Sequence, residues 1–278
     1  MFDKYKEVPD KKKKKNIIHY LPVYGCFSTG VIYTAIGVIA ILSFLKLKDG
    51  GADESRFLAL LNGFLVGKIL LVIILTGTAC WIIWRFYEAF TDPYDYGNNS
   101  KGIAMRTGIA LSTFADLIIV YAAIRFMFGL GNLNEKDQLY EQRLMVQDIL
   151  QVSWGSQLII IIGILITITA LAQLFYGITR GYRERLEIEE FHPLMKKLVH
   201  FLGLTGYFSR GIILGITGFF YIKAGILGNA SFIVDTDKAF DFIGDNIGHS
   251  YFIMIAIGTI FYGLFMFALG TSYDIDKD

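Results

Sequence analysis

Asp116 is the residue of this sequence whose position most favours chemistry. It lies near the middle of a largely apolar run, Ile103 to Phe128, about ten residues from Arg106 and hence about 15 Å deep if the run is a helix. Ionisable side chains at such depth are costly to place and are functional candidates by default. Asp116 could serve as a proton or cation site, with Gln173 or Thr169 on the next apolar run as its hydrogen-bond partner. The alternative is a neutral polar contact that holds two helices together.

Four further charged residues fall close to one end of the apolar runs. They are Arg85, Glu88, Arg106 and Arg210. Together they could form a charged cluster that faces the cytoplasm and binds lipid phosphate. The alternative is that they only anchor the ends of helices at the membrane surface.

The sequence lacks the patterns of most catalytic and cofactor sites. None of the four histidines forms an i,i+4 pair for zinc, and no glycine-rich phosphate loop or nucleophile elbow is present. The two cysteines, Cys26 and Cys80, lie in apolar runs and predict no disulfide framework. We therefore expect no catalytic residue, no metal, no cofactor and no nucleic-acid partner, and we predict that the protein is not an enzyme.

The elements that must position these residues are long enough to cross a membrane. The chain has 278 residues, of which 54% are apolar and 18% charged, and its mean hydropathy is +0.50. A spanning helix needs about 20 mainly apolar residues. Six runs meet this requirement: Gly25 to Leu45, Phe64 to Trp84, Ile103 to Phe128, Val152 to Thr179, Phe201 to Leu227 and Ser250 to Tyr273. The sequence thus predicts an all-α membrane protein with six transmembrane helices.

The orientation follows from the basic residues in the tails, in the loops and near the ends of the six runs; Lys68 and Arg210 are not counted. Sixteen Lys and Arg residues fall on the side of the N-terminal tail, which contains Lys11 to Lys15, and eight fall on the opposite side. Cytoplasmic loops carry the excess of Lys and Arg. We therefore expect a multi-pass protein with both termini in the cytoplasm.

Each of the three outward loops contains a short amphipathic stretch. Acidic and hydroxyl residues precede apolar residues at helical spacing in 53–61, 134–145 and 235–243, which is a helix-start signal. We predict short helices that lie at the outer membrane interface. The alternative is ordinary connecting loops.

An internal repeat relates the two ends of the chain. Displaced by 181 residues, the first pair of runs places six glycines on six glycines: Gly25, Gly30, Gly37, Gly63, Gly67 and Gly77 match Gly206, Gly211, Gly218, Gly244, Gly248 and Gly258. The middle pair matches less well, with Gly102 and Arg106 on Gly206 and Arg210. We predict three tandem, parallel two-helix units at 17–92, 101–182 and 196–273, which follow a basic cytoplasmic tail, 1–16, and form one bundle.

Glycines recur along single helix faces at the spacing typical of helix packing in membranes. Gly211, Gly215 and Gly218 form one such stripe. Because lipid tails are as apolar as leucine, close packing of small residues drives helix association in a bilayer. The alternative is that the stripe admits a ligand or a lipid.

Two segments carry a resemblance to a known family. The stretch from Gly67 through Gly77 to Trp84-Arg85-Phe-Tyr-Glu88-Ala89 resembles the closing half of a repeat in a bacterial membrane family catalogued as domain of unknown function 1206. The run Gly203-Leu-Thr-Gly206-Tyr-Phe-Ser-Arg210-Gly211 is similar to the opening half. The resemblance implies six helices in three pairs, a bacterial inner-membrane location and no assigned activity. The Arg-Gly pair of that opening half is Thr29-Gly30 in the first unit and Arg106-Thr107 in the second.

The sequence supports two interpretations of function. The first is a non-enzymatic accessory or scaffold subunit of a larger membrane complex, with membrane lipids and unidentified membrane proteins as partners, because little mass lies outside the membrane. The second is a small proton- or cation-coupled channel or carrier that uses Asp116.

Overall fold

The computed structural model describes residues 20–45, 65–92, 97–100, 102–103, 106–107, 109–110, 113, 137–186 and 192–272. This described part of the chain is helical and contains no β-strand. Five of its helices are long and apolar enough to cross a membrane: α1 (Leu21–Phe44), α3 (Leu65–Thr91), α6 (Gly155–Thr179), α7 (Pro193–Leu227) and α9 (His249–Thr271). The protein is therefore an all-α, multi-pass membrane protein.

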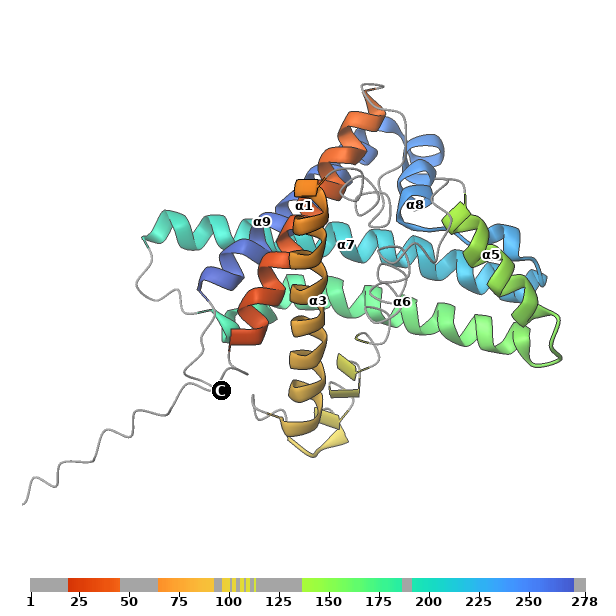
Figure 1. Cartoon of the computed structure of the whole chain (residues 1–278), viewed down its shortest axis with the longest axis horizontal. Coiled ribbons are helices and arrows are strands. Elements are labelled where there is room, and N and C mark those ends of the chain that lie inside the picture. Colours follow the sequence, from red (N-terminus) through yellow and green to blue (C-terminus); the bar gives the residue numbers. More distant parts are fainter. Residues whose placement is uncertain are drawn as a thin grey trace, which may run out of the picture.

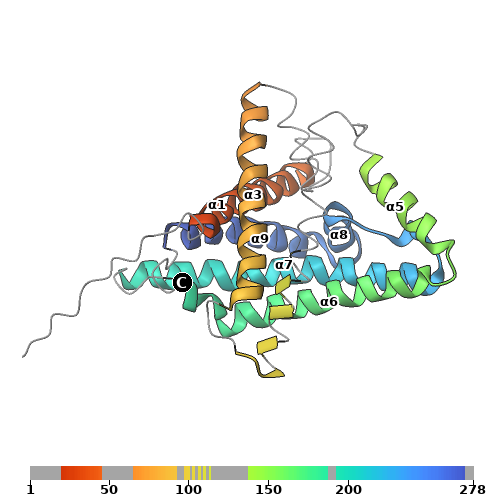
Figure 2. The ribbon, with the colours of Figure 1, turned by 60° about the horizontal axis from the view of Figure 1, so that its bottom comes forward.

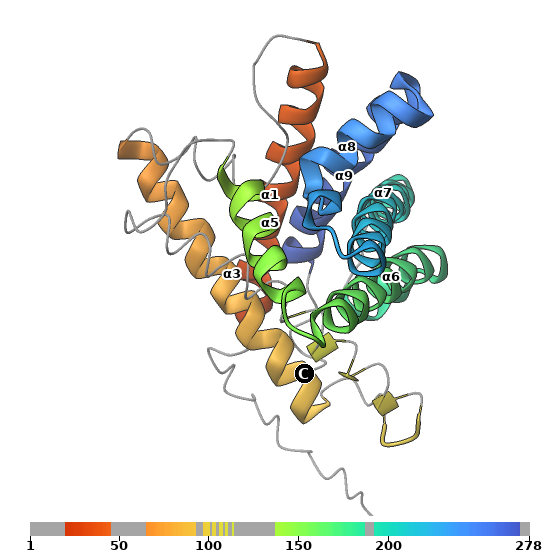
Figure 3. The same cartoon turned by 90° about the vertical axis from the view of Figure 1, so that its right-hand side faces the viewer.

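The five long helices pack in the order α3, α1, α9, α7, α6. Helices α6 and α7 run side by side over most of the length of α6, and α1 runs along α9 (Figure 1). Helix α1 also contacts α3, and α7 contacts α9. Viewed nearly along α6 and α7, these two helices stand beside α9 and α1, while α3 lies on the far side of α1 (Figure 3).

Glycines set the distance between the paired helices. A Cβ atom on Gly37 of α1 would lie 2.6 Å from the Ile260 side chain of α9. A Cβ atom on Gly163 of α6 would lie 2.6 Å from the backbone nitrogen of Ile222 on α7. Real Cβ atoms do not approach other atoms this closely, so only glycine permits these contacts. The small-residue packing predicted from the sequence is thus present in both helix pairs.

The spans agree with the predicted runs to within four residues except at the end of α3, which continues to Thr91 beyond the predicted Trp84, and at the start of α7. This helix begins at Pro193 rather than at Phe201 because His192 caps it: the Nδ1 atom of His192 accepts a hydrogen bond from the Leu194 amide, and proline suits the first turn. Its first two turns extend past the end of α6 (Figure 2). The third predicted run, Ile103 to Phe128, lies mostly outside the described residues, as does Asp116.

Short helices form in two of the three loops that were predicted to face outward. Helix α5 (Asp137–Leu150) packs on α6 and on the short η3 (Ala230–Phe232), and the Arg143 guanidinium donates two hydrogen bonds to the Ile233 carbonyl oxygen. Helix α8 (Thr236–Phe242) begins where Asp235 accepts a hydrogen bond from the Lys238 amide at 2.8 Å, and it continues into η4 (Ile243–Ile247). The first outward loop lies outside the described residues.

Candidate functional site

The guanidinium of Arg210 lies against two tyrosine rings that contact each other. Its Cζ atom is 4.9 Å from the ring centre of Tyr33 on α1 and 5.0 Å from that of Tyr262 on α9. The two rings meet edge to face at 4.9 Å, and Arg210 Nη1 donates a hydrogen bond to the Tyr262 hydroxyl. Arg210 itself comes from α7, so one cation connects three long helices. We call Arg210, Tyr33 and Tyr262 the arginine cage.

Close helix contacts bring the arginine cage together. A Cβ atom on Gly206 would lie 2.6 Å from the Cα atom of Tyr262, so α7 and α9 touch one turn before Arg210. Helix α1 is held against α9 by Gly30, whose Cβ position lies 2.9 Å from the Phe267 ring. Aromatic faces attract a cation most strongly where water is excluded. The cage therefore stabilises a charge that would be costly to leave alone inside an apolar bundle.

A cluster of aromatic residues continues from the cage toward the end of α6. The Tyr207 ring meets Tyr262 at 5.3 Å and stacks on Tyr182 at 5.9 Å, and Tyr182 meets Phe265 at 4.8 Å. Tyr182 is fully buried, and its hydroxyl donates a hydrogen bond to the His200 carbonyl oxygen at 3.1 Å. Tyr182 belongs to η2 (Gly181–Arg185), the tight turn after α6, so the cluster attaches this turn to α7 and α9.

Burial raises the pKa of the Tyr182 phenol above its ordinary value, because the phenolate would lose its hydration. The positive charges of Arg180 and Arg183 act in the opposite direction and only reduce the shift. The phenol therefore stays neutral at physiological pH and remains a hydrogen-bond donor.

Three of the four predicted charged residues gather at the last turns of α3. The Nη1 atom of Arg85 lies 3.1 Å from Oε2 of the fully buried Glu88, and its guanidinium lies 5.6 Å from the Trp81 ring centre. Arg106 donates from Nε to the Ala89 carbonyl oxygen at 2.8 Å and from Nη2 to the Phe90 carbonyl oxygen at 2.9 Å. These are carbonyl groups that the end of a helix leaves without internal partners.

Arg106 also contacts the turn that follows α3. Its Nη1 atom donates to Asn98 Oδ1 at 3.3 Å and lies 3.7 Å from Asp92 Oδ2. The positive charge thus stands at the negative end of the helix dipole. Arg210, the fourth predicted residue, has the separate aromatic setting described above. Whether the charged group at α3 binds lipid phosphate stays a prediction.

Gln173 lies on α6, as predicted, with its Oε1 atom buried. No described residue donates a hydrogen bond to this atom. Its predicted partner Asp116 is outside the described residues. The described part of the chain also brings together no group of three His, Cys, Asp or Glu side chains that could hold a metal ion.

The sequence does not reveal the aromatic members of the site. Tyr33, Tyr207 and Tyr262 lie in apolar runs, where aromatic residues are ordinary. One signal was available: a buried tyrosine needs a partner for its hydroxyl, and Arg210 is a span arginine that needs a partner for its charge. A single sequence does not show which helix faces which, so the tyrosine hydroxyls could not be assigned to Arg210 as its partners.

Comparisons with known proteins agree with the resemblance found in the sequence. The chain is 25% identical over 253 residues to "Uncharacterized protein YxxB" of Bacillus subtilis (strain 168), an alignment that covers 88% of each chain. No solved structure matches the chain. Residues 24–92, which hold α1, α3 and the Arg85–Glu88 pair, match the model of the family described as Domain of Unknown Function (DUF1206). Over this segment the chain is similar to the DUF1206 family, as the resemblance in the sequence suggested.

Proposed function

We propose that the protein is a non-enzymatic accessory or scaffold subunit of a larger complex in the bacterial inner membrane. In this proposal six spans form three tandem parallel units, 17–92, 101–182 and 196–273, and both termini lie in the cytoplasm. Membrane lipids surround the bundle, and a membrane protein contacts its apolar surface.

Contacts within the first and last units support the repeat. Gly25 packs on Trp81 in the first unit, and 181 residues later Gly206 packs on Tyr262. Likewise, a Cβ atom on Gly77 would overlap the Ser28 hydroxyl. In the last unit a Cβ atom on Gly258 would overlap the Ser209 hydroxyl.

Contacts between units support a register for the middle unit as well. Gly30 packs on Phe267 and the Gly263 carbonyl oxygen, and its counterpart Gly211 packs on Leu174 and the Ala170 carbonyl oxygen. The residues contacted on α9 and α6 differ by 93 in both cases. In the first helix of the middle unit, residue numbers are instead 104 lower than those of their counterparts on α7, as for Gly102 and Gly206. The offset thus changes from 104 to 93 between the two helices, so the loop that joins them is 11 residues longer in the middle unit than in the last unit. This extra length explains why its second helix drifts out of register in a direct comparison of sequences.

The observation that carries the scaffold proposal is how the charged residues near the spans are used. Arg106 caps α3, Arg85 pairs with Glu88, and Arg210 is held by two tyrosines. Each of these charges stabilises a contact between or within helices. A transport pathway would instead direct charged groups into a shared polar cavity.

Helix α6 offers the surface that a partner would contact. Of the most apolar stretch of 18 residues in this helix, only 17% is buried among the described residues. Six large apolar side chains along the helix are 44% to 69% exposed: Ile161, Ile164, Ile168, Leu171, Phe175 and Ile178. They recur every three or four residues, which places them on one face.

The test is purification in mild detergent at native expression level, followed by mass spectrometry of stoichiometric partners. We expect a partner that is lost in the double variant Ile168→Ala, Phe175→Ala. The control is the double variant Ile69→Ala, Ile83→Ala, which removes similar apolar area from exposed positions on α3. A protein that purifies alone, as a monomer or homo-oligomer, contradicts the scaffold proposal.

One observation favours the rival function, a proton- or cation-coupled channel or carrier. The buried Oε1 atom of Gln173 could accept a hydrogen bond from a protonated Asp116 carboxyl group, since no described residue fills that role. The rival predicts pH- or cation-dependent flux in proteoliposomes that disappears in a well-folded Asp116→Asn variant. Absence of flux in the wild-type protein under imposed proton and cation gradients removes it.

A further inference from the structure

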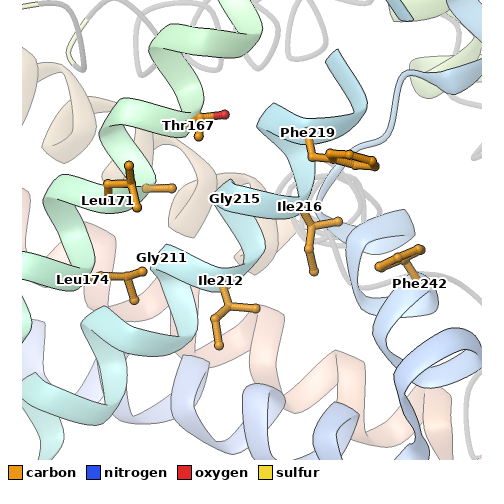
Figure 4. Close-up of a pocket in the computed structure, with 10 residues that line it drawn as sticks. Thr167, Leu171, Leu174, Gly211, Ile212, Gly215, Ile216, Phe219 and Phe242 are labelled. Atoms are coloured by element: carbon orange, nitrogen blue, oxygen red, sulfur yellow. The ribbon is translucent and has the colours of Figure 1, made fainter. Parts of the chain in front are cut away.

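An apolar groove of about 340 Å³ lies between α6, α7 and α8. Figure 4 shows Leu171 and Leu174 of α6 on one side, Ile212 and Ile216 of α7 along its floor, and Phe242 of α8 opposite. Its volume falls within the range of small-molecule sites, about 300 to 1,000 Å³.

The lining of the groove offers nothing to a polar ligand. Of the described residues that line it, Thr167 alone has a polar side chain, and its hydroxyl donates to the Gly163 carbonyl oxygen at 2.8 Å. Leu171 and Phe219 at the rim are 61% and 58% exposed among the described residues. A hollow of this kind binds an apolar group rather than water.

The second observation that favours a binding groove is the presence of Gly215 on its floor. Its neighbours Gly211 and Gly218 are required for packing on α6, because a Cβ atom there would lie 2.7 Å from the Leu174 side chain or overlap the Thr167 hydroxyl. Among the described residues, a Cβ atom on Gly215 would meet only the Ala170 Cβ atom, at 3.9 Å. Helix packing therefore does not explain Gly215, which instead keeps the floor of the groove open.

The corresponding contact between α1 and α9 is closed. Thr34 stands where the repeat places Gly215, and its side chain packs directly on Gly263 of α9. The hollow is thus a property of the α6–α7 pair and not of the helix geometry common to both pairs.

A cation stands one turn beyond the groove. Lys223 follows Phe219 by four residues and so lies on the same face of α7. Its Nζ atom lies 4.4 Å from the ring centre of Phe232 and 5.8 Å from that of Phe220, and no described acidic residue forms an ion pair with it. Phe220 in turn contacts the groove residue Phe242 at 5.2 Å.

The spacing of these parts fits a lipid. From Lys223 to Gly211 the helix rises about 18 Å at 1.5 Å per residue, and half of the hydrocarbon core of a bilayer is about 15 Å. We propose that the groove binds one acyl chain of an anionic phospholipid, with its phosphate held by Lys223 at the end of α7.

The test uses the full chain in phosphatidylcholine nanodiscs that contain a trace of phosphatidylglycerol with a photoreactive acyl chain. Labelled peptides are identified by mass spectrometry. We expect the label to concentrate on residues 167–174 and 211–219. Gly215→Leu, which fills the groove, should lower this labelling at least fivefold. Ala172→Leu introduces the same side chain at an exposed position of α6 outside the groove and should not.

The charge is tested separately. Lys223→Met should lower labelling by phosphatidylglycerol about fivefold, the effect of one lysine at a membrane surface, while Lys68→Met, an exposed lysine on α3, should leave it unchanged.

Retained thermal stability of Gly215→Leu shows that the variant is folded. Equal labelling in wild type and Gly215→Leu, or equal labelling by a neutral analogue, overturns the proposal. Disulfide crosslinking gives a further test. If Leu171→Cys forms a disulfide in high yield with a cysteine introduced in 114–128, or with a second copy of the chain, then that segment or copy occupies the groove and the proposal is wrong.

Discussion

The guanidinium of Arg210 on α7 stacks 4.9 Å from the ring centre of Tyr33 on α1. The two residues belong to the first and last pairs of helices, and Tyr262 of α9 contributes the second ring of the cage at 5.0 Å. Helices α1 and α7 are thus joined through a cation rather than through a long common interface. The charge of Arg210 should therefore matter for how the first and last helix pairs are held together.

We expect Arg210→Gln to destabilise the bundle by about 2 to 4 kcal/mol. Each cation–π contact of this kind is worth about 0.5 to 2 kcal/mol, and the hydrogen bond to the Tyr262 hydroxyl adds to them. Thermal unfolding in detergent should show a Tm lowered by roughly 5 to 15 °C. Arg183→Gln is the control, because Arg183 is exposed in η2. A variant as stable as the wild type would show that the rings hold the helices without the cation.

Gly77→Ala and Gly258→Ala should be destabilising to a similar degree, about 1 to 3 kcal/mol each. In both positions the new methyl group would overlap a serine hydroxyl, Ser28 or Ser209, across a helix pair. Gly215→Ala should be neutral or stabilising, because its methyl group meets only Ala170 and alanine favours the helix by about 1 kcal/mol. Thermal unfolding of the three variants checks this, and equal losses at all three positions would contradict it.

Features that depend on a single helix could be predicted from the sequence, and those that depend on two could not. Apolar length located the five described spans, and glycine spacing identified Gly211 and Gly218 as packing positions. For Gly215, the third glycine of that stripe, the described contacts do not show the predicted close packing. The start of α7 lies before the predicted run because Lys196 and Lys197 interrupt the apolar pattern, although Pro193 is a helix-start signal. The partners of Arg210 were missed because the rotation of one helix against another follows from packing of the whole bundle.

Arg106→Ala should fray the last turn of α3. The side chain donates to the Ala89 and Phe90 carbonyl oxygens, and hydrogen bonds to a charged donor are worth about 1.5 to 3 kcal/mol. Hydrogen exchange measured by mass spectrometry should quicken about tenfold or more for amides in 85–92, and remain unchanged in α9. Arg106→Lys keeps the charge but not the planar fork, so it should restore only part of the protection. Unchanged exchange in both variants would show that the cap does not limit opening of this turn.

The Tyr182 phenol should make stability pH-dependent above about pH 10. Its pKa in the folded protein is raised by burial, so the folded state binds the phenolic proton more tightly than the unfolded chain, whose tyrosines titrate near 10. The stabilising contribution is complete below the unfolded pKa and is lost as the pH rises through the raised pKa of the folded state. The Tm of the wild type should fall more steeply than that of Tyr182→Phe between pH 10 and 12. Parallel curves would mean that Tyr182 ionises without unfolding its cluster.

The repeat and the proposed pairing of Asp116 with Gln173 make opposing predictions. In the last unit Gly206 touches Tyr262, and the offsets of 104 and 93 transfer this contact to Gly102 and Thr169. If the middle unit follows the repeat, counting along antiparallel helices from this contact would place Asp116 opposite residue 155. Gln173 is then about 27 Å away along the bundle, at 1.5 Å per residue.

Disulfide crosslinking distinguishes these two arrangements. In a background with Cys26→Ala and Cys80→Ala, the pair Asp116→Cys and Ser156→Cys should crosslink under mild oxidation if the middle unit repeats the last. The pair Asp116→Cys and Gln173→Cys should not, because a disulfide requires Cα atoms within about 7 Å. The reverse result would mean that the middle unit departs from the repeat. It would also place the carboxyl group of Asp116 beside the buried Oε1 atom of Gln173, the arrangement that a proton or cation site requires.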